Sequence, residues 1–449
     1  MKTSAPISIT GPATPSQAHR GTASAVYHAL MTNDEQGLRL GRAFLERQLQ
    51  RAARLTCDLP ETPEQLGEWA RQGTHATSGA YQRYLEGRAQ GQPRRYFGNR
   101  AHALYFLQAM APTKLVDGAW LYGLLSRWRE QRFRGLIQRY LQRLGNGDPT
   151  QHSALRYKNL LAEHGCAAPA WLSDEHFVEG AQQLALGRLA ADYLPEVIGY
   201  SLGQEQVPLS IDAVELHELD IDPHCFHAPP SLGGDHAPKA VQAVLDNLPA
   251  AGDAQGFYRR VALGYRLNRL GQHGSAAIAA FDLERELLAM LERKRAVAGA
   301  MPSDFCRIGG RTVKQWLSQP GQLGDLLVAL CKRGWIQRHR NPQHSHFWRL
   351  LQSEYAVMFG RYERQLLHDW IAGDWLQTRP RANHPPAPRR HDPPPMTPRS
   401  AAGDGALDKQ LRELAEPARS ARLIELMAPA ANATPVGLAA PRVFANLLR

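Results

Sequence analysis

Apolar residues recur at helical spacing along most of this chain, and the alternation typical of half-buried strands is almost absent. The pattern first appears between about Ser24 and Gln50. Residues separated by three, four and seven positions lie on one face of an α-helix. The same spacing returns in further stretches: 102–141, 151–164, 177–189, 195–219, 236–248, 257–270 and 276–297. The sequence therefore predicts an all-α fold, with helices packed as a bundle.

A chain of 449 residues can bury a large core and normally divides into more than one domain. We expect a disordered segment at 1–24, a helical bundle at 25–299 and an accessory helical region at 300–375. Residues 376–449 begin with a Pro- and Arg-rich tract, so we expect a mostly disordered tail there. One amphipathic helix within that tail would fit residues 407–427.

The cysteine pattern and the hydropathy indicate a cytoplasmic protein. The five cysteines are scattered, with no Cys-x-x-Cys pair, which argues against disulfides and against a thiolate zinc site. The chain has no apolar run long enough to span a bilayer and no signal-peptide pattern at its start. We therefore expect no membrane association, and the chain could form a homodimer.

The formal charge of +11 raises the question of nucleic-acid binding. The basic residues are mixed with acidic ones over most of the chain, and the one concentrated basic tract, Arg379–Arg399, is also rich in proline. No zinc-finger, helix-turn-helix or aromatic ribonucleoprotein pattern accompanies it. Nucleic-acid binding is therefore the least favoured of the functions considered below.

Asp117 is the most unusual polar residue of the predicted bundle. Four apolar residues follow it at the spacing of a buried helix face: Trp120, Leu121, Leu124 and Leu125. A carboxylate on such a face must be paired, hydrogen-bonded, protonated or bound to a metal, because desolvating it alone costs too much free energy. The sequence leaves these alternatives open.

His152, Glu205 and His236 also interrupt apolar stretches. Taken singly, a histidine at a helix start is usually hydrogen-bonded or exposed, and a buried carboxylate usually caps a helix or pairs with a lysine or arginine. Taken together with Asp117, they place two histidines and two carboxylates on separate helices. Bundle-core iron sites are built from ligands that project inward in this way, and two histidines with one carboxylate suit non-heme Fe(II) and dioxygen.

Four short motifs, in this order, resemble one known family. They are Pro112–Leu121, Leu144–His152 with the following 160–165, Pro195–Glu205, and Asp235-His236-Ala237 before a helix. Together they resemble the heme-oxygenase-like non-heme di-iron oxidases and oxygenases, also described as iron-containing redox enzymes. The resemblance extends over about residues 25–375 and implies a heme-oxygenase-like bundle.

The resemblance also implies a ligand set and a chemistry. In such proteins a helix carboxylate, a Glu ten positions before a His, a later Glu and an Asp/His cluster bind two irons. Their reactions use dioxygen on small organic substrates, and include N-oxygenation and oxidative cleavage. On this correspondence Asp117, His152, Glu205 and His236 would be metal ligands, with Glu205 as a ligand or a general base, and one or two Fe(II) ions as the cofactor.

This chain departs from the family pattern at two expected ligands. Gln142 stands ten positions before His152, where the family has Glu, and its amide would be a poorer, neutral metal ligand. Glycine stands three positions before His236. His227 or Asp235 could compensate if the loop between them takes another register. Losing two anionic ligands weakens the hold on a second iron. An iron-dependent oxidoreductase is thus the first hypothesis, and a metal-free or metal-poor relative that binds a partner is the second.

Overall fold

The computed structural model describes most of the chain between residues 22 and 448. It leaves out 33, 167–171, 205–210, 224–235, 249–252, 296–306, 320–321, 354–358 and 379–400. The ordered elements of the described part are helices, one short hairpin and one isolated bridge, which confirms the predicted all-α class. The hairpin pairs β1 (Arg307–Ile308) with β2 (Arg311–Thr312) in antiparallel register.

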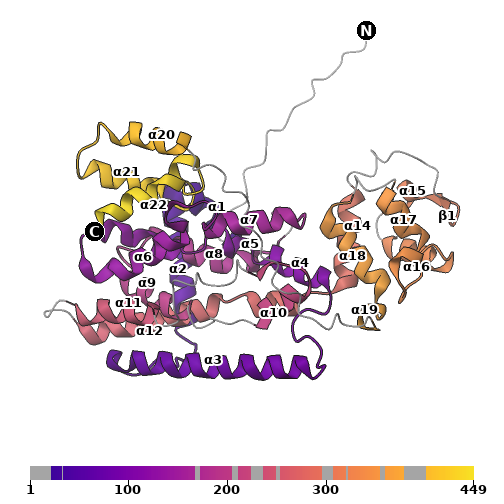
Figure 1. The fold of residues 1–449 in the computed structure, drawn as a ribbon, viewed down its shortest axis with the longest axis horizontal. Coiled ribbons are helices and arrows are strands. Elements are labelled where there is room, and N and C mark those ends of the chain that lie inside the picture. Colours follow the sequence, from indigo (N-terminus) through magenta and orange to yellow (C-terminus); the bar gives the residue numbers. More distant parts are fainter. Residues whose placement is uncertain are drawn as a thin grey trace, which may run out of the picture.

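The main body is a bundle of helices between residues 23 and 279 (Figure 1). Its elements are α1 (Ala23–Thr32), α2 (Glu35–Ala52), α3 (Leu66–Ala89), α4 (Arg100–Ala109), α5 (Ala111–Lys114), η3 (Ala119–Arg127), α6 (Arg134–Arg143), η5 (Gly145–Gly147), α7 (Ser153–Glu163), η6 (Asp174–Phe177), α8 (Val178–Arg188), α9 (Leu194–Gly203), α10 (Ile211–Glu218), α11 (His236–Asp246), α12 (Ala254–Gly271) and α13 (Gly274–Ala279). The η elements are 3₁₀-helices.

Glycines let the central helices approach closely. A Cβ atom on Gly199 of α9 would lie 1.8 Å from the Val261 carbonyl oxygen of α12. A Cβ atom on Gly187 of α8 would lie 1.9 Å from the Ala119 carbonyl oxygen of η3. These distances leave room only for hydrogen, so the backbone of α9 packs directly on that of α12, and the backbone of α8 on that of η3, around one apolar core.

A second apolar core lies in the lobe at one end of the molecule (Figure 1). The lobe contains α14 (Leu283–Arg295), the hairpin, α15 (Val313–Ser318), α16 (Leu323–Lys332), α17 (His346–Ser353), α18 (Arg361–Ala372) and α19 (Trp375–Thr378). The same core includes buried residues of α4 and α7. The structure therefore differs from the expected division at residue 300, because Leu287 and Met290 bury α14 in the lobe.

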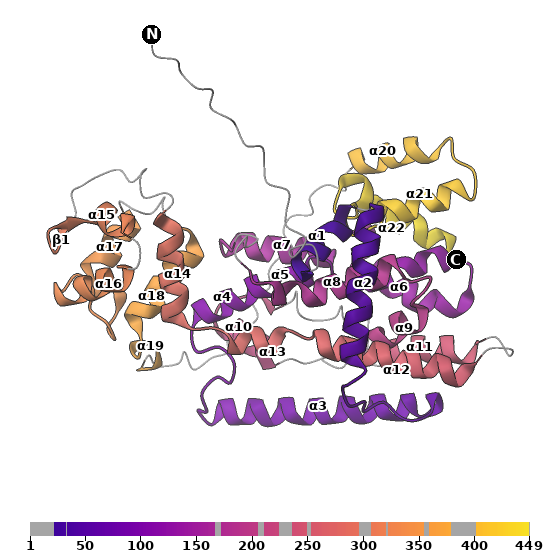
Figure 2. The ribbon, with the colours of Figure 1, turned by 180° about the vertical axis from the view of Figure 1, so that it is seen from behind.

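Three C-terminal helices cover the bundle near α6: α20 (Ala401–Leu411), α21 (Ala418–Leu426) and α22 (Pro435–Leu447). Figure 2 shows them from behind, stacked over the bundle. The Tyr140 hydroxyl of α6 donates a hydrogen bond of 2.6 Å to the Met427 carbonyl oxygen. Phe444 is fully buried and meets the Trp128 ring edge-on, with ring centroids 6.2 Å apart.

This arrangement differs from the mostly disordered tail that the sequence predicted for 376–449. The basic tract 379–399 dominates the composition of that segment and lies outside the described residues. The residues after it carry apolar side chains at helical spacing, such as Leu407 with Leu411 and Ala440 with Phe444, and all four are buried. Burial of these faces holds the segment on the bundle.

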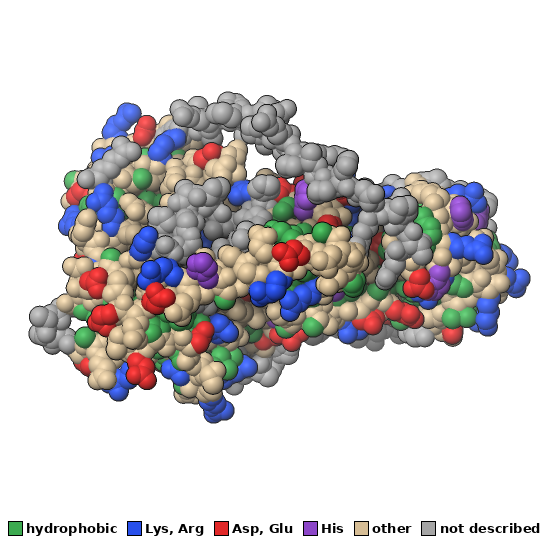
Figure 3. Space-filling view, turned by 60° about the horizontal axis from the view of Figure 1, so that its bottom comes forward, with side chains coloured by type: hydrophobic (Ala, Val, Ile, Leu, Met, Phe, Trp, Pro, Cys, Tyr) green, Lys and Arg blue, Asp and Glu red, His purple; other side chains and the backbone are tan. Residues whose placement is uncertain are grey.

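The described helices include none that is long and apolar enough to cross a membrane. On the face shown in Figure 3, lysine and arginine side chains lie among aspartate and glutamate side chains, without a broad surface of one sign. The described residues on this face therefore do not form the continuous basic patch that a phosphate backbone requires.

The packing of α22 can be tested at Phe444. Removing a fully buried phenyl ring leaves a cavity, so Phe444→Ala should lower the free energy of unfolding by about 3–5 kcal/mol. Chemical denaturation of the full chain would measure this. Val328→Ala serves as the control, because Val328 is 50% exposed and should change stability little. Equal stability of both variants would show that α22 does not pack on the bundle.

Candidate functional site

Asp117 lies in a turn between α5 and η3, and not within a continuous helix as the sequence predicted. Gly118 interrupts the helix with φ of +91°, a left-handed conformation that favours glycine. The four apolar residues that follow at helical spacing are nevertheless fully buried, on the 3₁₀-helix η3. The apolar face was predicted correctly, while the helix break at Gly118 was not.

The Asp117 carboxylate forms an ion pair with the Arg143 guanidinium at the end of α6. Both side chains are largely buried, with exposed fractions of 9% and 13%. The guanidinium also lies over the Trp120 ring, 5.8 Å from its centroid. Arg139, one turn earlier on α6, is buried as well. Of the partners that the sequence left open for Asp117, the structure shows an arginine.

A tight turn carries the chain from α6 to His152. Gly145, Asn146 and Gly147 all have positive φ, of 68°, 51° and 87°. The turn folds residue 152 back against Leu144, with which it forms an isolated antiparallel bridge. A Cβ atom on Gly145 would lie only 2.8 Å from the His152 backbone nitrogen. The Gly-Asn-Gly sequence is therefore what allows His152 to be positioned beside the end of α6.

His152 is 1% exposed and caps α7. Its Nδ1 accepts a hydrogen bond of 3.4 Å from the Leu155 backbone N–H. Its Nε2 is buried and has no hydrogen bond of normal geometry among the described residues, although Asn432 of the α21–α22 loop approaches the ring. Burial lowers the pKa of His152 to about 4, against a smaller opposing effect of Asp117. The imidazole is therefore neutral at pH 7, and because Nδ1 accepts a hydrogen bond, the single ring proton lies on Nε2.

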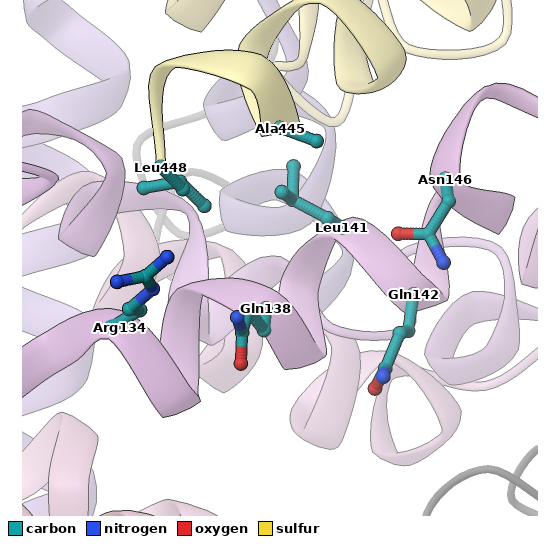
Figure 4. Close-up of a pocket in the computed structure, with 7 residues that line it drawn as sticks. All are labelled: Arg134, Gln138, Leu141, Gln142, Asn146, Ala445 and Leu448. Carbon is teal, nitrogen blue, oxygen red and sulfur yellow. The ribbon is translucent and has the colours of Figure 1, made fainter.

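Gln142 lies near the end of α6, and its buried Oε1 has no hydrogen-bond partner among the described residues. It lines a pocket of about 360 Å³ between α6 and the C-terminal helix α22. Figure 4 shows Ala445 and Leu448 of the C-terminal segment above α6. The residues that line the pocket are Arg134, Gln138, Leu141, Gln142, Asn146, Ala445 and Leu448.

The remaining candidate ligands cannot be placed with Asp117 and His152. Glu205, His227 and Asp235 lie outside the described residues. His236 is the first residue of α11, as the sequence predicted. The structure describes its backbone and not its side chain. The structure thus places Asp117, Gln142 and His152 around the end of α6. The assignment of Glu205, His227, Asp235 and His236 as ligands stays a prediction.

A buried polar layer in the centre of the bundle was not found from the sequence. Glu179, Gln182 and Gln183 of α8 are 6%, 0% and 0% exposed. Tyr200 of α9 and Asn268 of α12 are fully buried as well. Each buried polar group left without a partner costs about 1–3 kcal/mol. The signal was present in the sequence, since three polar residues at i, i+3 and i+4 interrupt an otherwise apolar helix.

Glu179 connects this layer to a pair of histidines. Its carboxyl accepts from the Thr113 hydroxyl (3.5 Å) and the Gln204 amide (3.4 Å). Burial raises the pKa of Glu179 to about 7, with a smaller opposing effect of Lys114. Nearby, His176 Nδ1 and His273 Nε2 lie 2.6 Å apart and share a hydrogen bond. Burial, and to a lesser extent His273, lower the pKa of His176 to about 4.

The described side chains fit a metal ion only in part. The Nε2 atom of His152 is buried and lacks a hydrogen bond of normal geometry among the described residues, and it would become a metal donor once the ring proton moved from Nε2 to Nδ1. The Asp117 carboxylate is already engaged by Arg143. Within the described residues, no three His, Cys, Asp or Glu side chains converge closely enough to hold a metal. A complete site would need further ligands from the segments around Glu205 and His236.

The comparisons with known proteins give one match. Residues 104–265 match the model of a family described as iron-containing redox enzyme. The matched stretch begins in α4 and ends in α12, so it contains all the candidate ligands and leaves out the lobe and the C-terminal helices. No curated protein and no solved structure matches the chain.

The buried state of His152 predicts a specific pH dependence of stability. The unfolded chain binds a proton at this histidine near pH 6.5, whereas the folded chain does so only near pH 4. The stabilising contribution is therefore complete above pH 6.5 and is lost as the pH falls toward 4, by about 2–4 kcal/mol. His152→Asn keeps a residue that caps helices and should lack this component. Denaturation between pH 4 and 8 would test it, and identical pH profiles would contradict it.

Proposed function

We propose that this protein, whose residues 104–265 match the model of the iron-containing redox enzymes, is an oxidoreductase that uses non-heme Fe(II) and dioxygen on a small organic substrate. The family match supports a redox enzyme in general. The non-heme iron centre, the use of dioxygen and the class of substrate are parts of the proposal. A cytoplasmic location and a homodimer also stay predictions.

The observation that carries the proposal is the buried Nε2 atom of His152, next to the Asp117 carboxylate. A buried imidazole usually donates or accepts with both nitrogens, because leaving one without a partner costs free energy. Here Nδ1 accepts from the Leu155 N–H, and Nε2 has no hydrogen bond of normal geometry among the described residues. The low pKa keeps the ring neutral, with its single proton on Nε2 while Nδ1 accepts. A metal at Nε2 would require this proton to move to Nδ1, at the expense of the 3.4 Å hydrogen bond from the Leu155 N–H.

Asp117 would supply a carboxylate ligand of the iron centre. Glu205 and His236 would supply further ligands. Asp117 lies close enough to His152 to affect its pKa. Its ion pair with Arg143 would compete with a metal, since the guanidinium and the metal bind the same oxygen atoms. When bound, Fe(II) would supply dioxygen chemistry. The apolar core around Trp120 and Tyr140 would keep bulk water away from that position.

Iron binding tests this proposal directly. Anaerobic full-length protein is expected to retain one or two Fe(II) ions, and His152→Ala should weaken binding more than about tenfold, since even the loss of a supporting residue costs that much. Bound iron is measured after removal of excess metal. His164→Ala is the matched control, because His164 is also buried, at the other end of α7, and is not a proposed ligand. Iron-free wild-type protein would refute the proposal.

One observation favours a second function, that of a metal-poor relative that binds a partner. The Asp117 carboxylate is neutralised by Arg143 without any metal, and Gln142 supplies a neutral amide where the resemblance implies a carboxylate. In that case the ion pair is structural and holds the end of α6 against the turn after α5.

Arg143→Met separates the two functions. The substitution leaves a buried carboxylate without its partner, so both functions predict a loss of about 3–5 kcal/mol in the absence of metal. In the iron enzyme, added Fe(II) should take the place of the guanidinium and restore the unfolding temperature. In the metal-poor relative, Fe(II) should have no effect. Arg42→Met is the control, because its ion pair with Asp192 is exposed and contributes little.

A further inference from the structure

The polar layer of α8, α9 and α12 contains more hydrogen-bonding atoms than the described residues satisfy. Four side chains contribute atoms that are buried and have no hydrogen-bond partner of normal geometry among the described residues. They are both amide atoms of Gln182, both amide atoms of Gln183, the Tyr200 hydroxyl and Asn268 Nδ2. All four residues are 0% exposed.

These residues face one another in the bundle. Glu179, Gln182 and Gln183 share one face of α8, since they are spaced at i, i+3 and i+4. A Cβ atom on Gly271 of α12 would lie 2.0 Å from Gln182 Oε1, so this amide reaches α12. Tyr200 lies beside Asn268 and Gln204, and the Glu179 charge acts on it. The layer is therefore one cluster contributed by three helices.

Packing alone gives no reason for these residues. A leucine or methionine at either glutamine position would fill a similar volume without leaving polar atoms unsatisfied, and would stabilise the apolar core. Buried polar groups without partners are the places where bound water, ions or ligands are expected. The glutamines therefore indicate an occupant that pairs with them.

We propose that this layer binds a small uncharged molecule that carries a carboxamide or a similar group with both a donor and an acceptor. The proposal goes beyond the redox function, because it concerns binding in the absence of iron. Its residues also differ from the candidate metal ligands.

The chemical class follows from the unsatisfied atoms. A carboxamide can form two parallel hydrogen bonds with a glutamine side chain, donating to Oε1 and accepting from Nε2. A carboxylate ligand would satisfy Nε2 and leave Oε1 without a donor. An ammonium ligand would satisfy Oε1 and leave Nε2 without an acceptor. Because both atoms of Gln182 and of Gln183 lack partners, the carboxamide fits the layer best.

Three probes of nearly equal size distinguish these classes: propionamide, propionate and propylamine. Their binding to full-length, metal-free protein can be followed by ligand-observed NMR, with thermal unfolding measured in parallel. Propionamide should bind saturably and more tightly than either ion. Gln182→Leu and Gln183→Leu should weaken its binding at least about tenfold. Both variants should also unfold at a higher temperature, because a buried unsatisfied amide has been removed.

Two further variants make the result decisive. Gln108→Leu is the matched control, because Gln108 is 3% exposed but its amide is hydrogen-bonded to the Leu104 carbonyl oxygen, and it should bind propionamide like wild type. Tyr200→Phe removes one oxygen atom with little change in shape and should also weaken binding. The proposal is overturned if propionamide does not bind saturably, if either ion binds as tightly, or if the layer variants bind like the control. A rise in unfolding temperature without any amide binding would mean that the layer holds only water.

Discussion

The ion pair between Asp117 and Arg143 is the interaction on which the candidate site depends. It joins the turn after α5 to the last turn of α6, and Gly118 makes room for it, since a Cβ atom there would lie 3.1 Å from Arg143 Cγ. The end of α6 in turn fixes the Gly-Asn-Gly turn and the position of His152. A buried ion pair adds little net stability over an apolar pair of similar shape, but losing one partner is costly. The pair therefore acts mainly to specify where α6 ends.

The bundle centre combines two opposing tendencies. Glycines bring α9 into direct backbone contact with α12, and α8 into direct backbone contact with η3, which increases dispersion. In the same place α8 presents Gln182 and Gln183, whose amide atoms have no hydrogen-bond partner among the described residues. In most proteins the local propensity, the hydrophobic pattern and the hydrogen bonding of a segment all favour the same structure, except at functional positions. This layer and His152 Nε2 account for much of the disagreement, and further buried atoms without a partner among the described residues lie on Gln48 of α2 and on Trp348, Tyr362 and Trp370 of the lobe.

Much of the helical architecture could be predicted from apolar spacing, and the burial of Trp120, Leu121, Leu124 and Leu125 followed from it. The break before Trp120 could not, because a glycine within a helical pattern can be tolerated or can adopt positive φ, and only packing decides. The ion pair of Asp117 was one of several open alternatives, because Arg143 is 26 residues away in sequence. The C-terminal helices were missed because the composition of one basic tract obscured the apolar faces after it.

The closure of the first core by α20–α22 sets an order of events during synthesis. Tyr140 and the Met427 carbonyl oxygen, which it binds, are 287 residues apart. At a synthesis rate of about 5–20 residues per second, the apolar surface of α6 is made about 15–60 s before the helices that cover it. Contacts of such long range also slow folding itself. For that interval the nascent bundle exposes a hydrophobic face that binding by a chaperone would protect.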